Sequence, residues 1–161
     1  MFRLPFRAAL LASAAALLAA PALRADDKPA DKPARPKVEV VFCLDTTGSM
    51  GGLLRGAQAK IWAICNQIAG GRPTPTLRVG LVAYRDRGDE YITKIFDLTD
   101  DLDAVHGNLQ AFVAKGGGDI PESVNQALDD AVHKIKWSDD PKVLKMIFLV
   151  GDAPPEAAAG K

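Results

Sequence analysis

Apolar residues change their spacing along the chain, and each spacing predicts a different kind of element. Residues 38–44, VEVVFCL, form a continuous β-branched and aromatic run, which is typical of a strand covered on both faces of a parallel sheet. Residues 77–84 and 143–150 are predicted strands as well. Residues 91–98, YITKIFDL, alternate in a way that predicts a strand with one face closer to solvent.

Between these strands, apolar residues recur at helical spacing in residues 53–68, 101–114 and 122–136. Gly70 and Pro73 mark the end of the first predicted helix. Strands that alternate with helices predict an α/β fold. We expect a Rossmann-like, doubly wound and mostly parallel sheet with one antiparallel strand and helices on both faces.

The antiparallel strand follows from the length of one connection. Only six residues, 85–90, separate the second and third predicted strands, which is too short for a parallel crossover and predicts a hairpin. If the strand order is third, second, first, last, Asp45 and Asp152 end the two strands that flank the ligand crevice of an open α/β sheet. Each successive strand or helix reverses the direction of the chain, and following these reversals places Asp119 at the same edge of the sheet.

The N-terminal segment differs from the rest of the chain. Two arginines precede residues 8–23, which are almost wholly alanine and leucine, and small residues offer cleavage sites between Ala20 and Asp26. This pattern predicts a signal peptide over residues 1–25 and a periplasmic or secreted protein. About 16 apolar residues fall short of the roughly 20 that span a bilayer, so no membrane span is expected after cleavage.

Residues 26–37, DDKPADKPARPK, contain no apolar side chain larger than alanine and predict a disordered linker. Residues 38–161 then form one domain. The whole chain of 161 residues carries 20 basic and 20 acidic side chains, but the signal peptide holds three of the arginines and no acid. The mature chain therefore has 17 basic and 20 acidic side chains, a net charge of −3.

Composition excludes several kinds of chemistry. The balanced charge and the absence of a basic block argue against nucleic-acid binding. Two cysteines, Cys43 and Cys65, and two histidines 27 positions apart do not make a zinc site. An oxidising compartment permits a bridge between the two cysteines, although buried free thiols are equally ordinary. Carboxylates and hydroxyls remain as the working groups.

Such groups are concentrated directly after the first predicted strand. Asp45, Thr47 and Ser49 place a carboxylate and two hydroxyls at alternate positions between a strand and a helix. Hard oxygen ligands on a tight turn suit a cation such as Mg²⁺. The alternative is that Thr47 or Ser49 caps the following helix and that Asp45 is a solvated strand end.

Several motifs in order resemble the von Willebrand factor type A (VWA) domain, particularly its exported bacterial members. They are DTTGSM at 45–50, the YRDRGDE hairpin, the GGGDIPES loop and LVGDAPP at 149–155, so the resemblance covers about residues 37–155. It implies a metal-ion-dependent adhesion site for Mg²⁺, or Mn²⁺ or Ca²⁺. Thr47 and Ser49 would be inner ligands, while Asp45 and Asp152 often act through water in the family.

The resemblance implies metal-dependent recognition of a protein, without chemistry on that ligand. An acidic side chain of the partner can complete the coordination of the metal. Because the hairpin lies at the metal edge, Arg85, Asp86 and Arg87 are candidates for a partner-binding rim.

Two departures from the family affect these expectations. Asp119 stands where the family has a threonine ligand, and its spacing to Glu122 also fits a helix capping box. If Asp119 reaches the metal, a third carboxylate would weaken capture of an acidic partner. Family members also continue through further helix and strand units, so we expect an incomplete C-terminus, with residues 143–150 as an uncovered edge strand.

Two other interpretations involve the same segments. DTTGS is also similar to the phosphorylation motif of haloacid-dehalogenase-like phosphotransferases, in which Asp45 would be the nucleophile and Asp152 a magnesium ligand. Those enzymes place a second aspartate or a lysine beside the nucleophile, where this chain has Thr46. The tripeptide Arg87-Gly88-Asp89 matches an integrin-binding sequence, but a charged hairpin tip is the simpler account.

Overall fold

The computed structural model describes residues 34–118 and 123–152. The predicted signal peptide, most of the predicted linker and Asp119 lie outside these ranges. The strands are β1 (Lys37–Asp45), β2 (Thr76–Tyr84), β3 (Thr93–Thr99) and β4 (Leu144–Val150). The helices are α1 (Leu54–Ala69), α2 (Leu102–Gln110) and α3 (Val124–His133), and a short 3-10 helix, η1 (Gly48–Gly52), precedes α1.

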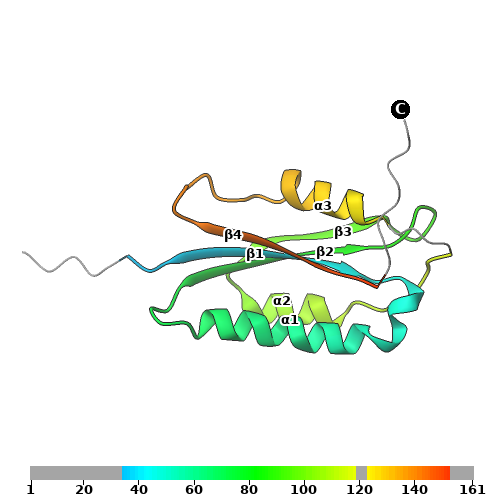
Figure 1. Cartoon of the computed structure of the whole chain (residues 1–161), viewed down its shortest axis with the longest axis horizontal. Coiled ribbons are helices and arrows are strands. Elements are labelled where there is room, and N and C mark those ends of the chain that lie inside the picture. Colours follow the sequence, from blue (N-terminus) through cyan, green and yellow to red (C-terminus); the bar gives the residue numbers. More distant parts are fainter. Residues whose placement is uncertain (1–33, 119–122, 153–161) are drawn as a thin grey trace, which may run out of the picture. The chain divides into compact units, whose positions relative to one another are not determined.

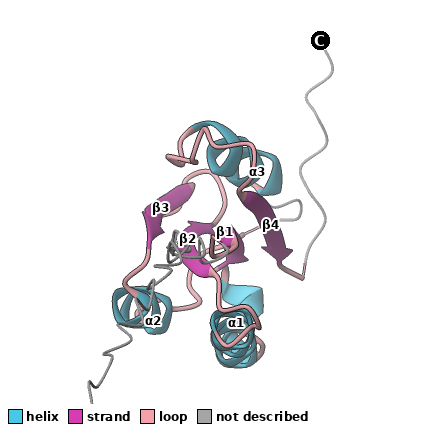
Figure 2. Ribbon diagram, turned by 90° about the vertical axis from the view of Figure 1, so that its left-hand side faces the viewer, coloured by secondary structure: helices cyan, strands magenta, loops and turns pink. Residues whose placement is uncertain are grey.

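The strands form one sheet in the order β3-β2-β1-β4. β1 pairs in parallel with both β2 and β4, whereas β2 and β3 are antiparallel. Helices α1 and α2 lie on one face of this sheet and α3 lies on the other (Figure 1 and Figure 2). The predicted α/β class, strand order and hairpin are therefore confirmed.

Successive residues of the central strand β1 point into two separate cores. Phe42 and its alternate neighbours pack on the side of α1 and α2, where the Phe42 ring stacks on Phe148 with centroids 5.2 Å apart. Val41 and Cys43 pack on the side of α3. Because both faces of β1 are buried, its sequence is a continuous apolar run rather than an alternating one.

The two cysteines belong to different cores and are both free. Cys43 lies under α3, where its thiol donates to the Ala127 carbonyl at 3.7 Å, and Cys65 lies in α1 on the other face of the sheet. Burial raises the pKa of Cys43 to about 12, with a smaller contribution from Asp130, and burial raises the pKa of Cys65 to about 11. The alternative of a bridge is not realised.

Helix α2 ends at Gln110, earlier than the predicted end at residue 114. The Gln58 side chain of α1 is buried and donates to the Leu109 carbonyl at 2.8 Å and to the Phe112 carbonyl at 3.1 Å. The Leu109 carbonyl also accepts from the Phe112 amide at 3.4 Å, so Gln58 adds side-chain bonds where the helix ends.

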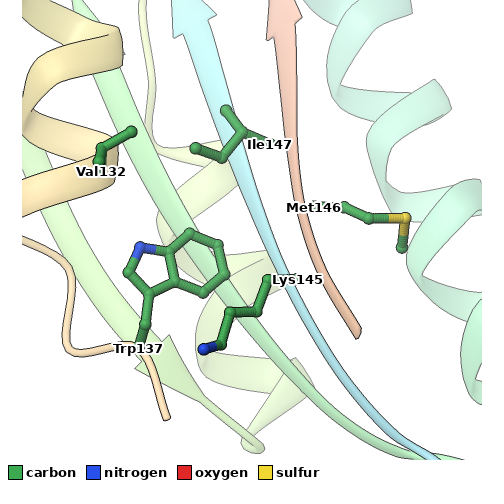
Figure 3. Close-up of a pocket in the computed structure, with 5 residues that line it drawn as sticks. All are labelled: Val132, Trp137, Lys145, Met146 and Ile147. Atoms are coloured by element: carbon green, nitrogen blue, oxygen red, sulfur yellow. The ribbon is translucent and has the colours of Figure 1, made fainter. Parts of the chain in front are cut away.

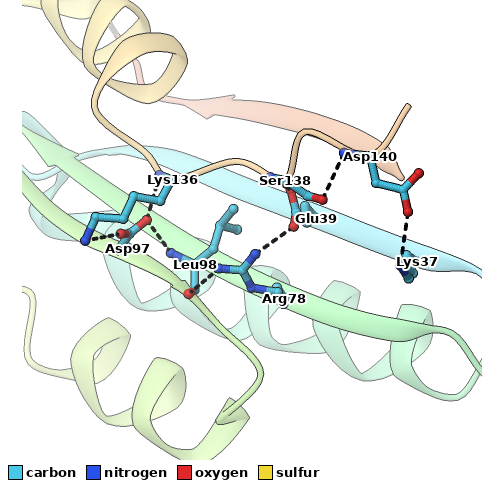
Figure 4. A network of polar contacts seen from close by, with 8 residues as sticks. All are labelled: Lys37, Glu39, Arg78, Asp97, Leu98, Lys136, Ser138 and Asp140. Atoms are coloured by element: carbon cyan, nitrogen blue, oxygen red, sulfur yellow. Dashed lines mark hydrogen bonds and ion pairs between the residues drawn. The ribbon is translucent and has the colours of Figure 1, made fainter. Parts of the chain in front are cut away.

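A polar network closes the opposite end of the sheet, where β1 begins (Figure 4). The buried carboxylate of Glu39 accepts from Arg78 at 2.8 Å and from the Ser138 amide at 2.9 Å. Asp97 accepts from the Lys136 amide at 2.9 Å. The network ties the connection between α3 and β4 to the first three strands.

Asp130 fastens α3 to the sheet from a fully buried position. Its carboxylate accepts from the Thr93 hydroxyl at 2.6 Å and from Gln126 at 2.7 Å, and it pairs with Lys134 at 2.8 Å. Burial raises the pKa of Asp130, but the hydrogen bonds from Lys134, Thr93 and Gln126 outweigh burial and hold this pKa below 3.8.

The lowered pKa of Asp130 predicts a pH dependence of stability. A carboxylate with a lowered pKa in the folded state stabilises the fold above its unfolded pKa, and this stabilisation disappears as the pH falls through the folded pKa. We expect Asp130→Asn to reduce the free energy of unfolding by about 2 kcal/mol at pH 7, since it removes bonds to a charged acceptor. Denaturant unfolding should show this deficit shrinking below about pH 4.

The exposed Asp100 provides the matched control, because Asp100→Asn should change stability by less than about 0.5 kcal/mol. A deficit of Asp130→Asn that is equally large at pH 7 and at pH 2 would contradict this account.

Strand β4 forms one edge of the sheet, where Leu144, Ile147 and Leu149 are exposed by 36% to 55%. A hollow of about 380 Å³ lies on the α3 side, where Val132, Trp137 and Ile147 line it, while Met146 points away from these three (Figure 3). Within the part of the chain that the structure describes, none of the helices has the length and apolar composition of a bilayer-spanning segment.

Candidate metal centre

The ends of β1 and β4 bring Asp45 and Asp152 to one edge of the sheet. Asp45 is the last residue of β1, and the parallel register pairs Leu44 with Val150, so Asp152 follows β4 at the same height. Between them, Gly151 allows a close approach, because a Cβ atom at this position would overlap the Tyr84 hydroxyl and lie 3.3 Å from the Cβ of Asp45. The predicted placement of these two aspartates is confirmed.

The four predicted ligands in the described region form one chain of oxygen atoms. Asp45 Oδ1 accepts from the Thr47 amide at 2.8 Å and from the Thr47 hydroxyl at 2.7 Å. The Thr47 hydroxyl lies 3.0 Å from the Ser49 hydroxyl, which donates to Asp152 Oδ1 at 3.0 Å. The turn thus gathers two carboxylates and two hydroxyls from both strand ends.

Helix capping does not explain these hydroxyls. Thr47 precedes η1, but its side chain makes no capping bond there and donates to Asp45 instead. Helix α1 begins after Leu53, again without a side-chain cap. The alternative in which Thr47 or Ser49 caps the following helix is therefore wrong.

The site is buried at one end and open at the other. Asp45 and Thr47 are fully buried, whereas Ser49 and Asp152 are exposed. Asp45 Oδ2 is buried and has no hydrogen-bond partner among the described residues. Burial raises the pKa of Asp45; two bonds from Thr47 act in the opposite direction, and the charges of Asp152 and Asp86 raise it further.

These features fit a hard divalent cation. An unpartnered buried carboxylate oxygen beside hydroxyl and carboxylate oxygens is a donor set of the type that Mg²⁺ takes, with waters in its remaining positions. Within residues 34–118 and 123–152, no three histidine, cysteine, aspartate or glutamate side chains gather closely enough to hold a metal. Among these described residues, a cation at this site would therefore depend on the hydroxyls of Thr47 and Ser49 as well as on the two carboxylates.

A glycine segment, residues 116–118, borders the turn that contains the ligands. The Gly48 amide donates to the Gly116 carbonyl at 2.9 Å, and the Lys115 amide donates to the Thr46 carbonyl at 3.0 Å. Gly48 leaves room for this contact, because a Cβ atom there would lie 2.8 Å from the Gly116 oxygen. Asp119 follows this segment outside the described residues, so its metal role stays a prediction.

The family model of the von Willebrand factor A domain matches residues 39–161. This chain belongs to that family. The VWA domain-containing protein 7 of Mus musculus and that of Homo sapiens are each 35% identical to it over 124 residues. The match covers 76% of this chain and 13% of each relative, so the chain spans a small part of the relatives' length.

A solved structure shows the same VWA fold. It is the pilus adhesin SpaC from Lactobacillus rhamnosus GG in an open conformation, with a TM-score of 0.58 and 18% sequence identity. The likeness covers 77% of this chain and 15% of the adhesin.

The structure revises the predicted rim of this VWA domain. Arg85 is buried, and its guanidinium donates to the carbonyls of Thr46 at 3.1 Å and Val113 at 2.9 Å and lies over the Tyr91 ring. Asp86 is buried as well, so of the three predicted residues Arg87 is the exposed one. Sequence alone gives no sign of this burial, because five charged residues and a glycine in residues 85–90 resemble a solvated hairpin tip.

The integrin-like tripeptide is not displayed as a free acidic tip. The Asp89 carboxylate turns toward the glycine segment, where it accepts from the Gly117 amide at 2.9 Å and from the Asp86 amide at 3.2 Å. These inward contacts use the carboxylate that an integrin ligand would present.

Two further residues, Thr46 and Tyr91, bond to each other beside the candidate ligands. Thr46 is fully buried, and its hydroxyl donates to the Tyr84 carbonyl at 3.0 Å and lies 2.9 Å from the Tyr91 hydroxyl. The DTTGS pattern draws attention to the alternate residues 45, 47 and 49, and it gives no signal for the residue between the first two.

Proposed function

We propose that this VWA domain recognises a protein partner through a divalent cation held at the carboxyl edge of its sheet. Asp45, Thr47, Ser49 and Asp152 would hold the cation, and Asp119 is an additional predicted ligand. Mg²⁺ is the favoured ion, with Mn²⁺ or Ca²⁺ as alternatives. The observation that most supports this proposal is the buried, unpartnered Asp45 Oδ2 at the end of a continuous chain of oxygen ligands.

The exposure of the site favours a partner that meets the cation at the surface. Ser49 and Asp152 face solvent, so an external group can approach the cation from their side. If Asp45 and Asp152 are the only carboxylates at the cation, an acidic side chain of a protein can replace one of its waters and supply a further anionic oxygen. Coordination by Asp119 as well would weaken this capture. The structural neighbour is itself described as an adhesin, which is consistent with a binding role.

The phosphotransferase alternative has less support. When an aspartate carboxylate accepts a phosphoryl group, a neighbouring general acid assists by giving a proton to the leaving group. The neighbouring Thr46 hydroxyl is buried between the Tyr84 carbonyl and the Tyr91 hydroxyl, and Asp45 Oδ1 is held by two bonds from Thr47. We therefore propose binding without chemistry on the ligand.

Export of the protein belongs to the same proposal. The predicted signal peptide over residues 1–25 would deliver the domain to the periplasm or the exterior, and residues 26–37 would separate it from the export signal. An envelope or extracellular protein is then the expected class of partner.

A pull-down from envelope extract tests the proposed function. We expect the tagged domain to retain a partner in magnesium buffer and to release it when EDTA is added. Asp45→Ala should retain none, whereas the exposed control Asp100→Ala should behave as the wild type. Retention that is insensitive to EDTA and unaffected by Asp45→Ala would contradict a cation-dependent site.

A further inference from the structure

The hairpin between β2 and β3 reaches the glycine segment through two carboxylates. Asp89 Oδ2 accepts from the Gly117 amide at 2.9 Å, and Asp86 Oδ2 accepts from the Gly118 amide at 3.4 Å. The same Asp89 oxygen accepts from the Asp86 amide at 3.2 Å, which fixes the hairpin turn. The hairpin and the glycine segment are therefore held together by side chains of the hairpin.

The other side of the glycine segment touches the turn that contains Thr47. Gly116 accepts from the Gly48 amide, and a Cβ atom on Gly117 would lie 3.2 Å from the Cβ of Thr47. The segment consequently lies between the hairpin carboxylates and the proposed metal ligands.

This arrangement requires glycine. Gly116 and Gly117 both have φ near +75°, a left-handed conformation that other residues rarely adopt. A Cβ atom on Gly116 would also overlap the Asp89 carboxylate. Consecutive amides in such a turn form a concave anion-binding surface, and here the chain's own carboxylates use it.

We propose that Asp86 and Asp89 are positioning residues of the cation site. They hold the glycine segment against Thr46, Thr47 and Gly48, and in this way they keep the Thr47 hydroxyl in place for the cation. This inference rests on the proposed cation-binding function and adds the hairpin to it. Without the carboxylates, three consecutive glycines would gain conformational freedom and Gly48 would lose a fixed acceptor.

Two substitutions of Asp89 distinguish the loss of its charge from the loss of its hydrogen-bond acceptor. Both of its bonds end on one oxygen, so the amide oxygen of Asp89→Asn can accept them, whereas Asp89→Ala removes the acceptor. We expect Asp89→Asn to bind Mg²⁺ within about two-fold of the wild type and Asp89→Ala to bind about ten-fold more weakly. A change from aspartate to alanine at the exposed Asp100 is the control.

The experiment titrates MgCl₂ into the full chain by calorimetry and measures thermal unfolding in EDTA for each variant. The inference predicts that Asp89→Ala unfolds in EDTA within about 3 °C of the wild type while its Mg²⁺ affinity falls. Hydrogen exchange in EDTA should also be faster at the amides of Gly117 and Gly118 in Asp89→Ala than in Asp89→Asn.

Unchanged Mg²⁺ affinity in Asp89→Ala would overturn this inference and leave the proposed function intact. An affinity loss matched by an equal loss in Asp89→Asn would overturn it as well. If the wild type itself bound no Mg²⁺, the proposed function would fail, and the exchange data would still report whether the hairpin holds the glycine segment. Should Asp89→Ala not fold, Asp86→Ala removes the bond to Gly118 and is expected to weaken Mg²⁺ binding by a smaller factor.

Discussion

Asp45→Asn is expected to abolish stabilisation of the domain by Mg²⁺ while leaving the metal-free domain at least as stable as the wild type. The two effects have opposite signs because the Asp45 charge is unfavourable without a cation. Burial raises its pKa, and the charges of Asp152 and Asp86 act in the same direction. An asparagine oxygen can still accept the two bonds from Thr47, but it carries no charge to attract a cation.

The measurement is thermal unfolding in EDTA and in MgCl₂. A ligand that binds the native state stabilises it by about 2.7 kcal/mol at 100 times its dissociation constant. We expect the wild type to show a stabilisation of this order and Asp45→Asn to show none, which corresponds to an affinity loss of at least about 100-fold. The Asp100→Asn variant should keep the full response. A normal magnesium response in Asp45→Asn would contradict the proposed site.

Arg85→Met is expected to destabilise the domain by about 3 kcal/mol. The guanidinium is buried, donates to the Thr46 and Val113 carbonyls, and lies 4.4 Å from the centroid of the Tyr91 ring. Methionine fills similar space but provides no donor, so two hydrogen bonds from a charged group and one cation–π contact are lost. Denaturant unfolding measures the loss.

Glu90→Gln is the matched control for Arg85. Its ion pair with Arg85 is 3.4 Å long, and the Glu90 side chain is 73% exposed, so the pair should contribute less than about 1 kcal/mol. If Arg85→Met were no more destabilising than Glu90→Gln, the internal role of Arg85 would be wrong, and the predicted surface role would regain support.

The sequence predicts those features that depend on local pattern and chain direction. The continuous apolar run of β1 indicates burial on both faces, and the six residues between the predicted strands 77–84 and 91–98 are too few for a parallel crossover. Together with the predicted helices between the strands, these two facts give the direction of each strand. The sequence alone therefore places Asp45 and Asp152 together, and Ser49 bonds to Asp152 in agreement with that placement.

The sequence does not predict where the charged hairpin side chains point. Asp89 is bonded to an amide 28 positions away, and Arg85 is bonded to carbonyls 39 and 28 positions away. Such bonds depend on the tertiary approach of segments that share no local pattern. The same limit applies to the cysteines. Cys43 packs on one face of the sheet and Cys65, in α1, on the other, and the sequence does not predict on which face α1 packs.

A calorimetric titration of MgCl₂ into the wild-type chain and into Asp45→Asn tests the central claim most directly. The account predicts saturable binding of one cation per wild-type chain and no measurable binding to Asp45→Asn under the same conditions. A wild-type chain without saturable heat, or equal affinities in the two proteins, would contradict a cation site built on Asp45, Thr47, Ser49 and Asp152.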